Sequence, residues 1–288
     1  MVLRFIFLIS LLIPVASASA ALQRYVANEN ESTWVTSSSK LYCSLTHEIP
    51  IYGKAVFERH AVGKLGMRVE VKRKPHKVGL ARITSMAPSW KHDVRERDLG
   101  QTSYTVERTP FKFQHIQSRR FLSELEQGMY PTLSYQDWSD GRDEVLVSLS
   151  AVNIRPALGE FLDCIAAQLP YGFDYVRNSN VYFAFDSSRL DRKAKLRLDE
   201  LAAYLLADED VSGVAMYGRT DSKGRRGYND ALGRRRAESV RDYLVKKGVS
   251  KEKFTIKVRS YGERKPVATN RTSKGRAQNR MVEVSLLK

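Results

Sequence analysis

Residues 218–248 read GRTDSKGRRGYNDALGRRRAESVRDYLVKKG, a polar loop that runs into a long amphipathic helix. The helix is expected over about residues 228–247, and Gly248 is a typical C-terminal stop. Its apolar stripe consists of Leu232, Val240 and Leu244. Arg236 falls in the same stripe, four residues from each neighbour. Because an unpaired buried charge costs several kcal/mol, Arg236 needs a partner on the buried side of the helix.

Asp221, in the loop that enters this helix, is the nearest candidate partner in the sequence. One interpretation is a structural ion pair between Asp221 and Arg236. The other is half of a binding site, in which the guanidinium of Arg236 holds a ligand carboxylate and Asp221 meets a ligand ammonium. Structural pairs are commoner than sites, so the residues alone leave both interpretations open.

Strand and helix patterns alternate around this helix. Strands are expected at Asn180–Phe185, at Val211–Tyr217, and where apolar residues alternate around Ile256 and Val284. Between the first two, Asp186, Ser187 and Ser188 are expected to cap a helix. The apolar stripe of that helix is Leu190, Ala194, Leu198, Leu201 and Leu205. The order β-α-β-α-β-β predicts an α/β sandwich, in which helices cover one face of a small sheet.

The preceding residues, 21–175, predict a mainly β domain with two helices. Strands are expected at Ala55–Phe57, Leu65–Val71, Tyr104–Phe113 and Asp143–Ala151. Pro110 makes the third either a strand with a break or an edge strand. Helices are expected at Gln117–Gln127, which Gly128 would end, and at Ala157–Leu169. The predicted division of the chain is a leader at 1–20, a mainly β domain at 21–170, a linker at 171–179 and an α/β domain at 180–288.

The first twenty residues have the pattern of a secretory signal peptide. Arg4 precedes an apolar run from Phe5 to Val15, and small residues follow from Ala16 to Ala21. The alternative is a membrane anchor, but the run is shorter than the ~18–20 residues of a spanning helix. Cleavage is expected after Ala20, and the mature chain is expected to be exported with no transmembrane span. The absence of a cysteine at this position excludes lipid attachment there.

Export also bears on the two cysteines. In an oxidising compartment two cysteines usually pair, so Cys43 and Cys164 are expected to form a disulfide. Two buried free thiols are the alternative. Two cysteines are too few for a four-cysteine zinc site, and no metal or cofactor is expected.

Positive charge is concentrated in the last third of the chain. The whole sequence has a net charge of +16, and residues 178–288 hold 26 basic and 14 acidic residues. This balance predicts an anionic partner. Nucleic acid is excluded as an expected partner because the chain is exported, which leaves lipid headgroups or an acidic polymer.

Many residues of the C-terminal region match one domain family in order and spacing. They are Tyr182–Ser187, then Gly218–Gly224, Asn229, Leu232 and Arg235–Ala237, then Gly262, Glu263, Pro266, Asn270, Gly275–Ala277, Asn279 and Arg280. From about Asn180 to Leu287 the chain resembles the OmpA-like family of peptidoglycan-binding domains. Agreement along about a hundred residues is far more specific than a short motif.

This resemblance implies that the domain binds the diaminopimelate residue of peptidoglycan stem peptides. Asp221, of the Thr220-Asp221 pair, and Arg236 would hold its zwitterionic end. The resemblance places four other residues in the pocket: Thr220, Asn229, Leu232 and Arg280. The chain departs from the family at Arg219, where His is common, and at Met281, where a second Arg is common. Both positions lie beside pocket residues, so the departures put the affinity in doubt.

The front half resembles a second family. Ser123–Trp138, with support from Ala55–Phe57, Ser85–Trp90 and the placing of both cysteines, is similar to the N-terminal domain of MotY, the family of polar flagellar motor accessory proteins. The resemblance implies a periplasmic component of a ring around the basal body, the T ring, that helps stator units assemble and stay anchored. Its implied partners are a second small ring protein, the basal-body ring and the stator complex.

The sequence therefore carries competing hypotheses. A structural anchor would bind the motor and the wall, and a general envelope tether would bind the wall without any role in motility. The third is an enzyme tethered to the wall. Five scattered histidines without metal-ligand spacing, and the lack of a G-x-S-x-G motif, indicate no catalytic residues and argue against the enzyme.

Overall fold

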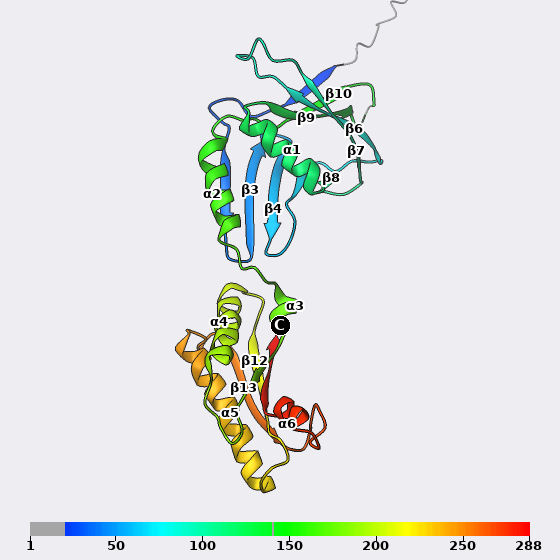
Figure 1. Ribbon diagram of the computed structural model, residues 1–288. Helices are drawn as coiled ribbons and strands as arrows, with labels where there is room; N and C mark the ends of the chain where they lie inside the picture. The colour runs from blue at the N-terminus through cyan, green and yellow to red at the C-terminus, as the bar shows by residue number, and fades with distance from the viewer. Residues whose placement is uncertain (1–20, 140) are drawn as a thin grey trace, which may run out of the picture. The chain divides into compact units, whose positions relative to one another are not determined.

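The computed structural model describes residues 21–139 and 141–288 (Figure 1). The leader predicted at 1–20 lies outside these residues. As predicted, a β-rich region precedes an α/β region. Contacts between Cα atoms group the chain into two compact units. The first runs to Trp34 and includes Thr46–Val56 and Met67–Ile154, and the second contains Val35–Leu45, Phe57–Gly66 and Arg155–Lys288. The predicted domain boundaries differ from this grouping and stay a prediction.

One sheet of the front region has the strand order β1-β10-β9-β6-β7. Its strands are β1 (Leu22–Tyr25), β6 (Gly79–Met86), β7 (Arg97–Tyr104), β9 (Tyr130–Gln136) and β10 (Glu144–Ser148). β1 pairs parallel with β10, and the other pairs are antiparallel. Val145 and Val147 of β10 are buried, which confirms the alternation read from the sequence.

The other front sheet has the order β2-β3-β4-β5-β8. Its strands are β2 (Trp34–Ser38), β3 (Tyr42–Ile49), β4 (Gly53–His60), β5 (Gly66–Val71) and β8 (Phe111–Phe113). The predicted break at Pro110 is confirmed, because β7 ends at Tyr104 and β8 begins at Phe111. Helix α1 (His115–Glu126) follows, and Gly128 ends it with a positive φ of 73°.

Helix α2 (Ile154–Ala166) carries the second cysteine. Cys164 is joined to Cys43 of β3 by a disulfide with a Cα–Cα distance of 6.0 Å, which confirms the predicted pairing. The bridge closes a sequence separation of 121 residues, so it removes many conformations from the unfolded chain.

The C-terminal sheet has the order β11-β14-β12-β13. Its strands are β11 (Asn178–Tyr182), β12 (Gly213–Arg219), β13 (Thr255–Gly262) and β14 (Met281–Leu287). β12 and β13 are parallel, and β14 runs antiparallel to both β11 and β12. The helices are α3 (Phe173–Val176), α4 (Arg192–Ala207), α5 (Arg226–Lys246) and α6 (Ser273–Asn279).

Helices α4 and α5 cover the same face of this sheet (Figure 1). The shared core includes Leu198 and Leu201 of α4, Val240 and Leu244 of α5, and Met216 of β12. Fully burying each such side chain contributes roughly 1.5–3 kcal/mol. The predicted stripes therefore face the core, and Gly248 ends α5 with a positive φ of 99°, as expected.

One local prediction is wrong, and the structure contains two short helices that the sequence did not predict. Asp191, not the Asp186–Ser188 run, caps α4, because its carboxylate accepts a hydrogen bond from the Ala194 amide. Helix α6 was not expected, since its seven residues carry no apolar stripe. The segment predicted as a linker, 171–179, contains α3 and the start of β11. Within the described part of the chain, no helix has the length and apolar character needed to cross a membrane.

Candidate functional site

A cavity of about 170 Å³ lies where β12 ends and α5 begins. Four segments line it: the residues after β11, the loop after β12, the first turns of α5, and Arg280 just before β14. The lining residues are Phe185, Asp186, Thr220, Asp221, Lys223, Gly224, Tyr228, Asn229, Leu232, Arg236 and Arg280. All six residues predicted for the ligand site are therefore brought together here.

A close approach of α5 to β12 positions the cavity. A Cβ atom on Gly218 of β12 would lie 1.8 Å from the carbonyl oxygen of Gly233 in α5. Only a glycine allows the two backbones to come this near. Arg236 follows Gly233 by nearly one helical turn, so its side chain reaches the loops beyond the end of β12.

Arg236 is fully buried, as its place in the apolar stripe predicted. Its guanidinium donates three hydrogen bonds to backbone carbonyls: Nε to Ser187 at 2.8 Å, Nη1 to Arg219 at 3.0 Å and Nη2 to Ala184 at 3.0 Å. A direct ion pair with Asp221, one of the two interpretations that the sequence left open, is not among these bonds. Burial lowers the pKa of Arg236 to about 10, and the charge of Asp221 opposes this shift. The side chain is therefore still protonated at neutral pH.

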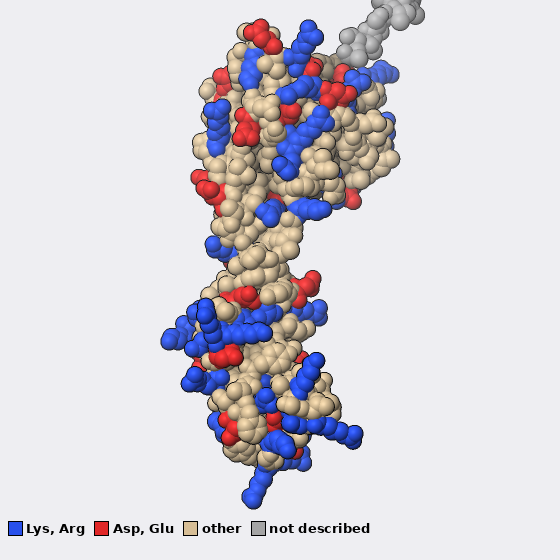
Figure 2. All heavy atoms as spheres, in the orientation of Figure 1, with Lys and Arg blue, Asp and Glu red and all other residues tan. Residues whose placement is uncertain are grey.

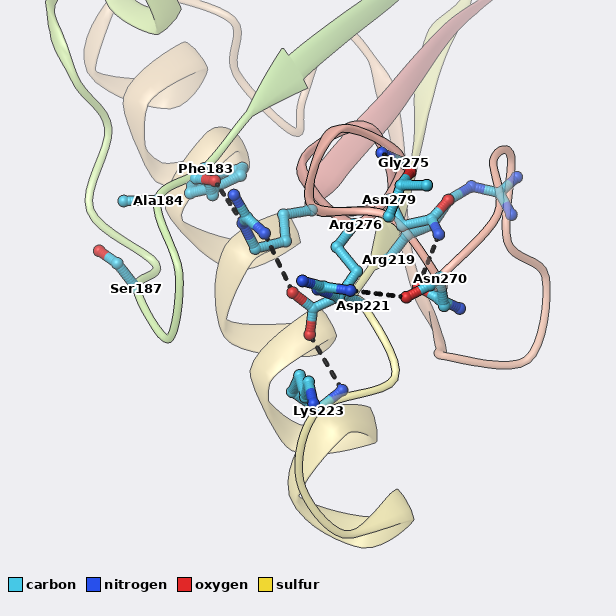
Figure 3. Close-up of polar contacts among 12 residues, drawn as sticks. Phe183, Ala184, Ser187, Arg219, Asp221, Lys223, Asn270, Gly275, Arg276 and Asn279 are labelled. Atoms are coloured by element: carbon cyan, nitrogen blue, oxygen red, sulfur yellow. Dashed lines mark hydrogen bonds and ion pairs between the residues drawn. The ribbon is translucent and has the colours of Figure 1, made fainter.

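The partner of Asp221 is Arg280. Its Nη1 lies 3.0 Å from Oδ2 of Asp221, while Oδ1 of Asp221 accepts a hydrogen bond from the Lys223 amide at 3.1 Å. The second contact is drawn as a dashed line in Figure 3. Asp221 is only 4% exposed, yet a carboxylate has about four acceptor positions. Two of these remain for a ligand donor.

Thr220 and Asn229 add polar atoms to the lining of the cavity. Thr220 Oγ1 is buried and has no hydrogen-bond partner among the described residues. Such orphaned buried groups are rare in native proteins, and a ligand atom would satisfy this one. Asn229 donates to the carboxylate of Glu263, which fixes the orientation of its side-chain amide. Leu232, 5% exposed, supplies an apolar surface beside them.

Sequence reasoning missed the rim of the cavity. The hydroxyl of Tyr228 donates to Asp186, whose backbone has a positive φ of 50°. Phe185 is 64% exposed beside it, and Lys223 is also exposed. Phe185 and Asp186 belong to the sequence motif but were interpreted as a strand end and a helix cap. Nothing in the sequence marked Tyr228.

The remaining motif residues build the loop that presents Arg280. Asn279 accepts hydrogen bonds from the Val267 and Ala268 amides and donates to Asn270, while Arg276 donates to the carbonyl of Asn270 (Figure 3). A Cβ atom on Gly275 would lie 2.0 Å from the Thr269 carbonyl oxygen. These residues therefore hold the loop rather than line the cavity.

The two departures from the family pattern lie outside the lining. Arg219 donates to the Lys265 carbonyl and pairs with Glu283 at 2.7 Å. Met281 is buried at the start of β14, 3% exposed. Both side chains therefore contact residues of their own domain and do not line the cavity. Any effect of either residue on a ligand would act through the backbone or through longer-range charge.

The cavity offers charges of both signs to one small ligand. Arg236 has five N–H donors, and three are used, which leaves two. These donors and the guanidinium of Arg280 suit a carboxylate, while Asp221 suits an ammonium. The arrangement therefore fits a zwitterionic group better than a simple anion or cation. The described residues contain no group of three or more His, Cys, Asp or Glu that could hold a metal ion.

Both halves of the chain match families of known proteins. Residues 25–170 match the family model of the MotY N-terminal domain, and residues 182–280 match that of the OmpA family. The sodium-type flagellar protein MotY of Vibrio parahaemolyticus is 34% identical over 283 residues, which is 92% of this chain and 90% of that protein.

The C-terminal half has further relatives. A peptidoglycan-associated lipoprotein of Pseudomonas putida is 46% identical over 103 residues, 36% of this chain and 60% of that protein. The crystal structure of the peptidoglycan-associated lipoprotein from Burkholderia pseudomallei shares 34% identity, covering 37% of this chain and 88% of that one, with a TM-score of 0.35.

The α/β fold and the family match define the C-terminal half as an OmpA-like domain, which follows a β-rich region in the sequence. One family model covers half of the chain, and 34% identity to a full-length relative runs through 92% of it. The chain belongs to the MotY family of flagellar motor accessory proteins.

Proposed function

We propose that this chain is a non-enzymatic periplasmic component of the flagellar motor, exported with a cleaved signal peptide, that binds peptidoglycan through its C-terminal cavity. The observation that carries the proposal is the juxtaposition of Asp221 with Arg236 and Arg280 in a small cavity. The ligand would be the zwitterionic end of diaminopimelate in a stem peptide.

Each end of that ligand has a partner in the cavity. The ammonium would meet Asp221, which keeps free acceptor positions beside Arg280 and the Lys223 amide. The carboxylate would take the two unused N–H donors of Arg236, which is already oriented by three carbonyls. Such charge-assisted bonds are about twice as strong as neutral ones, and preorganisation reduces the entropy lost on binding.

The basic surface supports the same partner. Lys and Arg side chains are spread over the visible face of the C-terminal region, especially around α4 and α5 (Figure 2). Most are exposed and lie outside the cavity, as Arg234 and Arg235 do. They would raise the rate of encounter with an anionic wall rather than contact one ligand group. This attraction should weaken as the salt concentration rises.

The front region would then bind the motor. Membership of the MotY family supports a place in the T ring around the basal body, with a second small ring protein, the basal-body ring and the stator complex as partners. Wall attachment would hold stator units in position around the rotor. The alternative is a general tether between the envelope and peptidoglycan that has no role in motility.

Co-sedimentation with purified sacculi tests the wall-binding step. Asp221→Asn keeps the size of the side chain and removes its charge, so it should weaken binding at least about tenfold. Arg234→Ala is a matched control, because Arg234 is exposed and pairs with Glu238 on the same helix. Equal binding by Asp221→Asn and the unaltered chain would reduce Asp221 to a structural role. Swimming of a deletion strain complemented with each variant separates the motor function from the general tether.

A further inference from the structure

A second, larger cavity lies in the β-rich region. Its volume is about 330 Å³. Its lining comes from β1, the β3–β4 turn, Arg73 after β5, β9 with the residues that follow it, and β10. Trp138, which ends the motif segment Ser123–Trp138, is one of its walls. The proposed wall-binding function does not use this cavity.

Four aromatic side chains form its apolar surface. Tyr135 and Trp138 are stacked with ring centroids 4.9 Å apart. Tyr52 lies 6.3 Å from Trp138 and 5.2 Å from Tyr25, and both pairs are tilted by 41°. Tyr135 donates to the Tyr52 hydroxyl at 2.9 Å, and burial raises the pKa of both phenols. The single hydrogen of Tyr135 is used in this bond, so the Tyr52 hydroxyl is the one that keeps its hydrogen for another acceptor.

The polar rim is built before any ligand arrives. Tyr25 donates its hydroxyl to Gln23 at 3.0 Å, and Gln23 donates to Asp143 Oδ2 at 3.1 Å. The Ala21 nitrogen, which cleavage after Ala20 would turn into the N-terminal ammonium, donates to Asp143 Oδ1 at 2.9 Å. The carboxylate of Asp143 keeps further acceptor positions, and the exposed guanidinium of Arg73 lines the same cavity. This chain of bonds fixes the wall that Tyr25 forms.

These features restrict the ligand. A purely apolar ligand would desolvate Asp143 and Arg73 without pairing them. A cation would meet Arg73, and an anion would meet the carboxylates of Asp137 and Asp143. Arg73 is exposed, and no hydrogen bond or ion pair among the described residues orients it, so its charge is not held in place for a zwitterion as Arg280 is beside Asp221. What fits is a neutral ring with apolar faces for the aromatic walls and both donors and acceptors around its edge. A sugar ring has this combination.

We propose that the aromatic cavity bounded by Tyr25, Tyr52, Tyr135 and Trp138 binds a sugar ring, and that the source is an N-acetylated amino sugar of the wall glycan. Ile51, 78% exposed on the cavity wall, gives the acetyl methyl group an aliphatic surface. The chain then holds the wall at two chemically different points, the stem peptide and the glycan. This site is independent of Asp221 and Arg236, so each can fail without the other.

Calorimetric titration of the full mature chain tests the proposal. The probe is the N-acetylglucosamine tetramer, which carries no stem peptide, and the glucose tetramer is the comparison. We expect saturable binding of the first with a Kd on the order of 1 mM. Trp138→Leu should weaken it about tenfold, and Arg73→Gln severalfold. The matched control is Trp90→Phe, because Trp90 is half-exposed in the same region and does not line the cavity.

Each outcome of this titration supports or overturns the proposal. Tighter binding of the acetylated tetramer assigns the wall glycan, while equal or tighter binding of the glucose tetramer keeps the sugar site and overturns that source. No saturation at tens of millimolar overturns the site. So does unchanged binding by Arg73→Gln, an exposed position at which folding is not at risk. If these variants bind the tetramer normally but stop co-purifying with basal bodies, the cavity is a protein-docking site and the proposal is wrong. Asp221→Asn should bind the tetramer normally, which separates this result from failure of the stem-peptide site.

Discussion

Replacing Arg236 with alanine should destabilise the C-terminal region strongly, even without a ligand. The guanidinium is the hydrogen-bond donor for the carbonyls of Ala184, Ser187 and Arg219, at distances of 2.8 to 3.0 Å. A buried group left without its partner costs about 1–3 kcal/mol. Water entering the adjacent cavity should satisfy some of these carbonyls, so we expect a total near the lower part of the summed range, about 3–5 kcal/mol.

Urea unfolding can assign this loss to one half of the chain. The three tryptophans, Trp34, Trp90 and Trp138, all precede the C-terminal region, so their fluorescence reports on the front region alone. Far-UV circular dichroism follows both regions. Arg236→Ala should shift the circular dichroism transition and leave the fluorescence transition in place.

The control is Arg234→Ala on the same helix, where the side chain is 70% exposed and pairs with Glu238 at 3.2 Å. It should change the free energy of unfolding by less than about 0.5 kcal/mol. A loss below about 1 kcal/mol for Arg236→Ala would refute the argument, because it would mean that the three carbonyls do not depend on the guanidinium. A large shift in the fluorescence transition would also contradict it.

Three further predictions test other parts of the chain. Replacing Cys43 or Cys164 with serine should lower stability by roughly 2–5 kcal/mol, and two free thiols in unreduced protein by mass spectrometry would contradict the bridge. Burial lowers the pKa of His47, whose neutral form makes hydrogen bonds with Thr33 and Ser150. The stability that this neutral form contributes is fully present above about pH 6.5 and should fall as the pH drops below that value. Melting curves of His47→Gln should show a weaker dependence of stability on pH. An exported fragment of residues 21–175 should gather at the flagellar base but support stator function poorly, whereas residues 178–288 should bind sacculi and spread around the envelope; fluorescence microscopy in which the second fragment alone concentrates at the base would move the motor-binding surface out of the front region.

Apolar periodicity predicted those parts of the fold whose strands and helices bury one clear face. The alternation around Val145 and Val147 identified β10, and the stripe through Leu232, Val240 and Leu244 identified α5. It gave no strand at β3, β6 or β9, although each of these buries several side chains. It also failed where an element is mostly exposed. β7 buries only Leu99 and Tyr104 of its eight residues, and α6 buries only Gly275 and Asn279. Such elements are held by pairing and loop contacts that leave no periodic signal.

The sequence predicted which residues lie at the candidate site, but not which hydrogen bonds and ion pairs they form. An arginine in an apolar stripe signals buried hydrogen bonds, and that signal identified Arg236 correctly. The sequence gives no information on backbone carbonyls, however, so the nearest carboxylate was the candidate partner. In the structure Asp221 pairs with Arg280, which lies 59 residues further along the chain. Tyr228 was missed because its role depends on the left-handed backbone of Asp186.

The most direct test of wall recognition compares two stem tripeptides by calorimetry with the full mature chain. One carries diaminopimelate in the third position and the other carries lysine, which lacks the second carboxylate. If Asp221 and Arg236 hold the zwitterionic end, the diaminopimelate peptide should bind at least about a hundredfold more tightly, since the lysine peptide leaves the guanidinium donors unpaired. Equal affinities for the two peptides would contradict the account.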